Sequence, residues 1–207
     1  MTNGRVLWFR CFADVPGVGY PGDPQRRSRL PERDFVPELD RRISRREREP
    51  SLRWPASDDE YPSGSPVYRL ASELDPAESS AQVRERVLSA LELPGEVKDY
   101  HFALQGAAEL LYKRRRQEPE NLAFVEWLAW FNVRLVEAYH ELFLTSHQGQ
   151  TYYLQVFALG FLLKLHEREG YWHEALALAE RFSRFRPHFD TPTELRARVA
   201  QLRAEHG

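Results

Sequence analysis

The chain has 207 residues, of which 42% are hydrophobic and 29% charged, and its formal net charge is −2. These values are typical of a soluble protein with one core-bearing domain and an appendage, and they exclude a wholly disordered chain. No N-terminal segment pairs a basic region with an apolar stretch of signal-peptide length, and the longest apolar-rich run, residues 152–165, is too short to span a bilayer. We therefore expect no membrane association and a cytoplasmic location.

Charge is distributed unevenly along the chain. Residues 1–57 contain 12 arginines and eight acidic residues, whereas residues 58–207 contain 17 basic and 23 acidic residues. The first part also carries scattered Pro and Gly and has no long helical periodicity. We predict a basic, irregular arm over 1–57, a linker over 58–67 and a helical domain over 68–207. Arginines outnumber lysines 26 to three, which indicates GC-rich coding and not a binding signature.

Three short motifs stand out in the arm. "RVLWFRCF" (5–12) predicts a strand, and "FVPELDRRISRRERE" (35–49) a short helix with Phe35, Leu39 and Ile43 on one side. "GVGYPG" (17–22) matches the GxGxxG pattern of dinucleotide-binding loops, but no apolar helix and no βαβ unit follow it, so we interpret it as a turn. The single Cys11 excludes an intramolecular disulfide and is interpreted as an apolar filler.

From residue 68 onward the pattern predicts an all-α domain of about six antiparallel helices, in a bundle or short superhelix. "DPAE" (75–78) predicts the first helix start, with Asp75 as N-cap, and the helix carries an apolar face. We expect the remaining helices at about 96–117, 120–145, 150–168, 172–185 and 191–205. Two apolar faces support this reading: Val83, Val87, Ala90 and Leu91 in the first helix, and Val97, Tyr100, Leu104, Ala108 and Leu111 in the second.

Three further features refine this pattern. The 120–145 segment is apolar around most of its circumference, as expected of a buried central helix. Gly160, in the 150–168 segment, would allow close contact with a neighbouring helix. His101 lies within the apolar stripe of 96–117 and is expected to be a hydrogen-bonded core or interface histidine.

The segment "LGFLLKLHEREGYWHEALALAERFSRFRP" resembles one tetratricopeptide (TPR) hairpin, over residues 156–189. The matching positions are Leu159 and Leu162 in the first helix, Gly170 and Trp172 at the turn, Ala175 at the small position and Pro187 at the close. Leu163, His166 and Phe182 depart from the family pattern, and a shift of 34 residues finds no second copy. The resemblance implies a helical hairpin of the kind used in protein-interaction scaffolds.

Two groups of residues could bind a metal ion. "HEREGYWHE" (166–174) holds two His-Glu pairs, but it lacks the spacing and the number of ligands of a metal site, so we interpret it as the corner between two helices. "EAYH" (137–140) is the Glu-x-x-His element of di-iron bundles, with Glu109 and Glu167 as supplements. Glu137 and His140 are therefore candidate metal ligands, although a solvated helix face explains them more simply, and no cofactor is expected.

Two sets of residues are candidates for partner binding. Trp130 lies on the charged stripe of the 120–145 helix with Arg134 and Glu137, where it either packs internally or marks a contact spot for a partner. The arm carries Arg41, Arg42 and Arg45 within a longer arginine series. These arginines could neutralise phosphates, or they could dock on the acidic helical body or on an acidic protein.

The sequence thus favours a non-enzymatic adaptor that presents a helical surface to a protein partner. The alternative is a nucleic-acid-associated accessory protein that uses the arginine-rich arm. A bundle-type metalloenzyme centred on Glu137 and His140 is the third hypothesis. The pattern identifies no catalytic residue and no oligomeric state.

Overall fold

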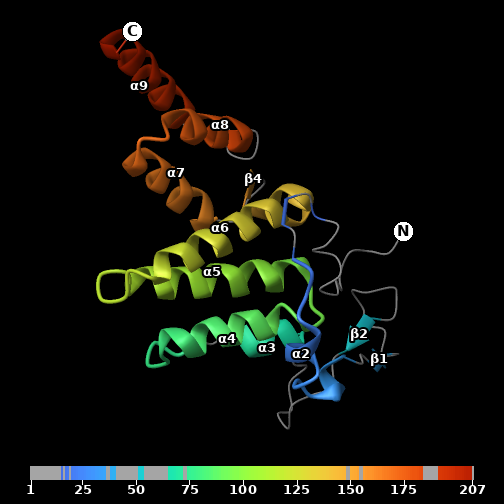
Figure 1. Ribbon diagram of the computed structural model, residues 1–207. Coiled ribbons are helices and arrows are strands. Elements are labelled where there is room, and N and C mark those ends of the chain that lie inside the picture. The colour runs from blue at the N-terminus through green and yellow to red at the C-terminus, as the bar shows by residue number, and fades with distance from the viewer. Residues whose placement is uncertain are drawn as a thin grey trace. The chain divides into compact units, whose positions relative to one another are not determined.

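The computed structural model describes most of the chain in an all-α fold, with two short two-stranded hairpins (Figure 1). It describes residues 15, 17–18, 20–35, 38–40, 51–53, 65–71, 74–147, 150–153, 156–183 and 191–206. The chain forms two compact units, Met1–Ala138 and Tyr139–Gly207. Over the described ranges, no helix combines the length and the hydropathy needed to cross a membrane.

The main helices of the first unit are α3 (Pro66–Ala71), α4 (Ser80–Ala90), α5 (Val97–Lys113) and α6 (Asn121–Ala138). Helix α5 lies between α4 and α6, and α3 packs on both α4 and α5 (Figure 1). The two apolar faces predicted for α4 and α5 are buried at every position. Helix α6 is buried over much of its circumference, as its apolar composition predicts.

The start of α4 differs from the prediction. Ser79 is its N-cap, and the Ser79 and Gln82 side chains form a reciprocal capping box with each other's backbone amides. Asp75 instead accepts a hydrogen bond from the Ala77 amide at 2.8 Å, within a turn before the helix. Both segments carry the residues of a capping motif, and the second lies directly before the apolar periodicity of α4.

The segment between the central helices also corrects the prediction. Helix α6 ends at Ala138, and a 3-10 turn, η2 (His140–Phe143), follows it. Strands β3 (Leu144–His147) and β4 (Gln150–Tyr153) then pair antiparallel, so the predicted helices 120–145 and 150–168 are wrong at their facing ends. Thr145, Thr151, Tyr152 and Tyr153 are residue types that favour strands. Pairing between the two strands satisfies the hydrogen bonds of their backbone N–H and C=O groups.

The second unit contains α7 (Phe157–Glu169), α8 (Trp172–Ser183) and α9 (Thr191–His206). Gly170 ends α7 with a φ of 81°, the left-handed conformation that turns the chain into α8. Helix α8 packs on both α7 and α9, and Leu159, Leu162 and Ala175 are buried. Gly160, by contrast, is exposed, and no described atom lies within 4 Å of the place where a Cβ would stand, so its predicted role in a close helix contact is wrong.

The described parts of the N-terminal region are short elements. They are α2 (Pro24–Arg27), η1 (Glu32–Phe35), β1 (Glu38–Asp40) and β2 (Ser51–Arg53). Leu39 of β1 pairs with Leu52 of β2 in an antiparallel register, so the predicted helix 35–49 is wrong where the structure describes it. Of the segment 17–22 that was predicted as a turn, residues 17–18 form a turn, and both Gly17 and Gly22 have positive φ.

Several predictions fall outside the described residues. They concern the strand at 5–12, Cys11, the arginines Arg41, Arg42 and Arg45, Pro187, and residues 58–64 of the predicted linker 58–67. The end of that linker is described and differs from the prediction, because α3 begins at Pro66.

Candidate functional site

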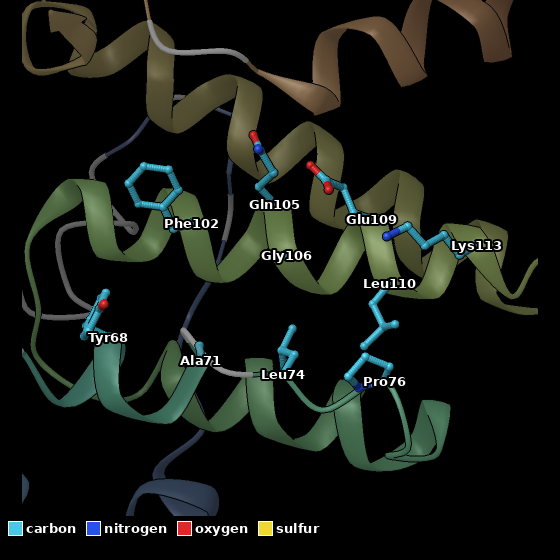
Figure 2. A pocket seen from close by; sticks show the side chains of 10 residues that line it. All are labelled: Tyr68, Ala71, Leu74, Pro76, Phe102, Gln105, Gly106, Glu109, Leu110 and Lys113. Atoms are coloured by element: carbon cyan, nitrogen blue, oxygen red, sulfur yellow. The ribbon is translucent and has the colours of Figure 1, made fainter.

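A groove runs along one side of the first unit, between α3 and α5 (Figure 2). Its volume is about 440 Å³, which is within the range of ligand-binding pockets. We call it the α3–α5 groove; it is lined by Tyr68, Ala71, Leu74, Pro76, Phe102, Gln105, Gly106, Glu109, Leu110 and Lys113. The two aromatic residues lie at one end of the row, and Glu109 and Lys113 lie toward the other (Figure 2).

The sequence of α5 explains how the helix serves the core and the groove together. Its core stripe includes Tyr100, Leu104 and Leu111, all fully buried. The groove residues of α5 recur at 102, 105–106, 109–110 and 113, which is the spacing of a second helical face. Helix α5 is therefore shared between two surfaces, and the groove face carries both apolar and charged side chains.

The aromatic end of the groove is open to solvent. Tyr68 is 49% exposed and Phe102 46% exposed, although both are large and hydrophobic. Pro76 lines the side of the groove that faces α5, and Arg114 Nη2 donates a hydrogen bond to its carbonyl oxygen at 2.7 Å. At the floor, Leu74 Cδ1 lies 3.6 Å from where a Cβ of Gly106 would stand. Exposed aromatic rings beside apolar side chains are a feature that protein-interaction surfaces share.

A second constellation lies where α4 ends. Glu92 is fully buried, and its carboxylate accepts hydrogen bonds from the Tyr20 hydroxyl, from the Asp23 amide at 2.7 Å, and from Arg27 Nη2 at 2.9 Å. Arg26 adds an outer contact, because its Nε and Nη2 each donate to the Glu85 carboxylate at 3.1 Å. Charge-assisted hydrogen bonds therefore connect residues 20–27, which we call the arm segment, to α4 and to the residue Glu92 just after it.

Aromatic contacts hold the start of the same segment against α6. The Tyr20 ring centroid lies 5.7 Å from that of Phe131 and 6.3 Å from that of Trp127. Burial of the phenol and the hydrogen bond to Glu92 raise the pKa of Tyr20, so its hydroxyl stays protonated and donates. We call Glu85, Glu92, Trp127 and Phe131 the Glu92 site.

The predicted partner-binding residues of α6 lie together. Arg134 Nη1 is 3.4 Å from a Glu137 carboxylate oxygen, and the Arg134 guanidinium lies 5.6 Å from the centre of the Trp130 ring. Gly17, in the N-terminal region, lies next to the Arg134 side chain, because a Cβ on Gly17 would be 3.0 Å from Arg134 Nε. The N-terminal region therefore covers part of the surface formed by Trp130, Arg134 and Glu137, which the sequence analysis offers as a contact surface for a partner.

The candidate metal ligands Glu137 and His140 lie on either side of the end of α6. Helix α6 ends at Ala138, so Glu137 lies in its last turn and His140 begins the 3-10 turn η2. Among the residues that the structure describes, no group of three or more His, Cys, Asp or Glu side chains is arranged to hold a metal ion. His166 lies in the last turn of α7 and His173 near the start of α8, as expected for a helical corner.

The sequence analysis does not single out Phe102, Glu92 or Tyr68 as residues of a candidate site. Phe102 stands off the apolar stripe of α5, and this aromatic residue on the polar side was an available signal. Glu92 stands in the apolar run "ALELP" (90–94), where a lone charge indicates a buried partner. Tyr68 and the pairing of Glu92 with residues 20–27 carry no local signal, because they depend on contacts between distant segments.

Comparison with known proteins gives no relative: no family model, no curated protein and no solved structure matches the chain.

Proposed function

We propose that this protein is a non-enzymatic interaction protein whose α3–α5 groove binds a segment of a protein partner. The observation that carries the proposal is the pair of half-exposed aromatic residues, Tyr68 and Phe102, at one end of a groove lined by apolar and charged side chains. Aromatic side chains of this kind supply much of the binding energy at protein interfaces, because they bury a large area at a small cost in conformational entropy.

The shape of the groove favours a short amphipathic helix as the occupant. Its α5 wall extends from Phe102 to Lys113, or about 16 Å at the helical rise of about 1.5 Å per residue. Three turns of a partner helix have a similar length and would place two or three apolar anchors against Phe102, Leu74 and Leu110. Glu109 and Lys113 would then contact polar residues at the far end of that helix and set its direction.

Two described arginines of the arm, Arg26 and Arg27, support a protein-binding role over a nucleic-acid one. Arg26 and Arg27 are engaged by Glu85 and Glu92, so their charges are already matched within the chain. Nucleic-acid binding and metalloenzyme activity remain hypotheses without a supporting contact in the described part of the molecule. The TPR-like character of α7 and α8 and a cytoplasmic location also remain predictions.

The proposal is tested by capturing partners from the native host with four full-length proteins: wild type, Tyr68→Ala, Phe102→Ala and Tyr171→Ala. Tyr171 is the matched control, because it is 52% exposed and aromatic but lies on the second unit. A photo-crosslinking amino acid placed at Gln105, inside the groove, then identifies the bound segment by mass spectrometry.

We expect a partner segment that cross-links at Gln105. A synthetic peptide of that segment should bind the wild type and the Tyr171→Ala variant equally, and the two groove variants at least about 10-fold more weakly, since loss of one aromatic anchor costs about 2 kcal/mol. Equal binding to all four proteins, or the absence of any cross-linked segment, would contradict the proposal.

A further inference from the structure

Four consecutive basic residues lie at the end of the helix that forms one wall of the α3–α5 groove. Lys113, the last residue of α5, lines the groove at the end away from the aromatic pair, and Arg114, Arg115 and Arg116 follow it (Figure 2). A cation at the C-terminal end of a helix is favourable because the helix dipole is negative there, and this effect does not depend on the groove. The contacts of the four side chains show which of them have an additional role inside the protein.

Arg114 and Arg115 contact neighbouring parts of the protein. Arg114 donates hydrogen bonds to the Pro76 carbonyl oxygen at 2.7 Å and to Ser80 Oγ at 3.3 Å. Arg115 donates to the Tyr112 carbonyl oxygen at 2.8 Å, and its guanidinium lies 3.9 Å from the centre of the Tyr112 ring. All of these acceptors are uncharged, so the two arginines have structural partners but keep their positive charge.

Lys113 and Arg116 are different, because both are exposed and neither forms a hydrogen bond or an ion pair with the described residues. Glu109 precedes Lys113 by four residues, the spacing of an ion pair on a helix, yet the described side chains do not form that pair. Glu118, which follows the basic run, accepts a hydrogen bond from Asn121 Nδ2 at 3.1 Å. The groove therefore ends beside a surface of net positive charge, and an occupant of opposite charge is complementary to it.

We propose that the segment bound by the α3–α5 groove is a helix that carries acidic residues at the end next to Lys113. This inference rests on the proposed function, since it specifies the chemistry of the occupant of the same groove. The apolar side chains of the helix contact Tyr68 and Phe102, and two or more acidic residues in its last turn contact Lys113 and Arg116. Glu109 limits where the acidic residues begin, because a carboxylate one turn earlier would be repelled by it.

The apolar part of the groove favours an acidic peptide over a nucleic acid. Phosphate groups would also be attracted by the basic end. Between the two ends, however, the groove is lined by Ala71, Leu74 and Leu110, whose aliphatic side chains suit apolar anchors and not a sugar–phosphate backbone. Glu109 lies in the same row and would repel a phosphate chain that followed the groove.

The test selects binders from a displayed library of helical peptides about 16 residues long, which span the α5 wall and add one further turn. The anchor positions and the last four positions are random. Selection is carried out on the full-length wild type and on the charge-reversed variant Lys113→Glu/Arg116→Glu. The matched control, Lys164→Glu/Arg203→Glu, makes the same two changes at exposed positions of the second unit. Peptides that still bind Phe102→Ala are discarded, so the remaining ones depend on the groove.

We expect the wild type and the control to enrich Asp and Glu at the last four positions, and the charge-reversed variant to enrich Lys and Arg. An enriched acidic peptide should bind the charge-reversed variant at least about 10-fold more weakly than the wild type in fluorescence anisotropy, because repulsion replaces attraction. This difference should decrease as the salt concentration rises. A purely structural role of the two cations would not reverse the charge that the peptides prefer.

A neutral variant keeps the inference falsifiable if the charge-reversed protein does not fold. Lys113→Gln/Arg116→Gln should reduce the enrichment of acidic residues without replacing them by basic ones. Unchanged enrichment in this variant would contradict the inference. Circular dichroism compares the fold of each variant with that of the wild type.

The outcomes separate this inference from the proposed function. Peptides that need Phe102 but show no charge preference would leave the groove as a helix-binding site and overturn the acidic partner. The absence of any peptide that needs Phe102 would contradict both. An oligonucleotide whose binding is lost on charge reversal and unchanged in Phe102→Ala would assign the basic end to nucleic acid. Self-association of the wild type that charge reversal prevents would assign the groove to a second copy of the chain.

Discussion

His101 of α5 and Asn132 of α6 form a buried polar pair inside an apolar helix interface: His101 Nδ1 lies 2.7 Å from Asn132 Oδ1, and neither residue is more than 1% exposed. Because an amide oxygen only accepts, Nδ1 of the neutral imidazole carries the proton and donates it. Burial lowers the pKa of His101, and the hydrogen bond to Asn132 opposes this shift only in part. The pair orients the two helices while the histidine stays uncharged.

Stability should therefore depend on pH through His101. In the unfolded chain the imidazole binds a proton near its ordinary pKa of about 6.5, whereas in the folded chain it resists protonation. The free energy of unfolding is then complete above about pH 6.5 and falls below that pH, by at most about 1.4 kcal/mol per pH unit. Urea unfolding of the wild type and of His101→Gln between pH 5 and 8 checks this: the variant should lose part of the acid sensitivity. Parallel pH profiles would show that His101 does not contribute.

The two arm arginines should differ in their effect on stability. Arg27 pairs with fully buried Glu92, so Arg27→Ala leaves a desolvated carboxylate with one charged partner fewer and should cost about 3 kcal/mol of the free energy that holds the arm segment in place. Arg26 pairs with exposed Glu85, so Arg26→Ala should cost about 1 kcal/mol or less. Hydrogen exchange at the Asp23 amide measures both effects. A larger effect of Arg26→Ala would contradict the central role of Glu92.

The start of α4 gives a test of the capping correction. Ser79 accepts a hydrogen bond from the Gln82 amide and completes a reciprocal box, so Ser79→Ala should lower the free energy of unfolding by about 1 kcal/mol. Asp75→Ala removes only a hydrogen bond in an exposed turn and should cost less, about 0.5 kcal/mol. Chemical denaturation of the two variants compares them directly. A larger loss for Asp75→Ala would restore Asp75 as the helix cap.

Two glycines of α7 should respond to alanine in opposite directions. Gly160 is exposed inside the helix with open space around its Cα, so Gly160→Ala should stabilise the second unit by about 0.5–1 kcal/mol through helix propensity. Gly170 adopts a φ of 81° at the helix end, and Gly170→Ala should destabilise the unit by about 1 kcal/mol because a Cβ disfavours that conformation. Thermal unfolding of both variants gives the signs. A loss of stability in Gly160→Ala would indicate the close helix contact that the sequence suggested.

The aromatic residues of the candidate groove show which site residues a local sequence pattern can predict and which it cannot. Phe102 can be noticed in the sequence because it departs from the apolar stripe of α5, but nothing near Tyr68 indicates that α3 places it opposite Phe102 across a groove. Trp130 is unusual in sequence because it lies on a charged stripe, and in the structure Arg134 lies over its ring and Gly17 lies beside that arginine. An unexpected residue can thus be found from sequence, whereas the element that packs on it cannot.

The helical class, the apolar faces of α4 and α5, the corner at Gly170 and the interior position of His101 can be predicted from sequence, because they follow from periodicity and backbone preference within a few residues. Three features depend on the tertiary structure: 144–147 pairs with 150–153, 38–40 pairs with 51–53, and Glu92 accepts hydrogen bonds from Tyr20 and Arg27. Strand pairing and buried charge pairing are stabilised by partners distant along the chain. These contacts stabilise the protein only after the chain has folded and brought the distant segments together, and the local sequence pattern does not indicate which segments those are.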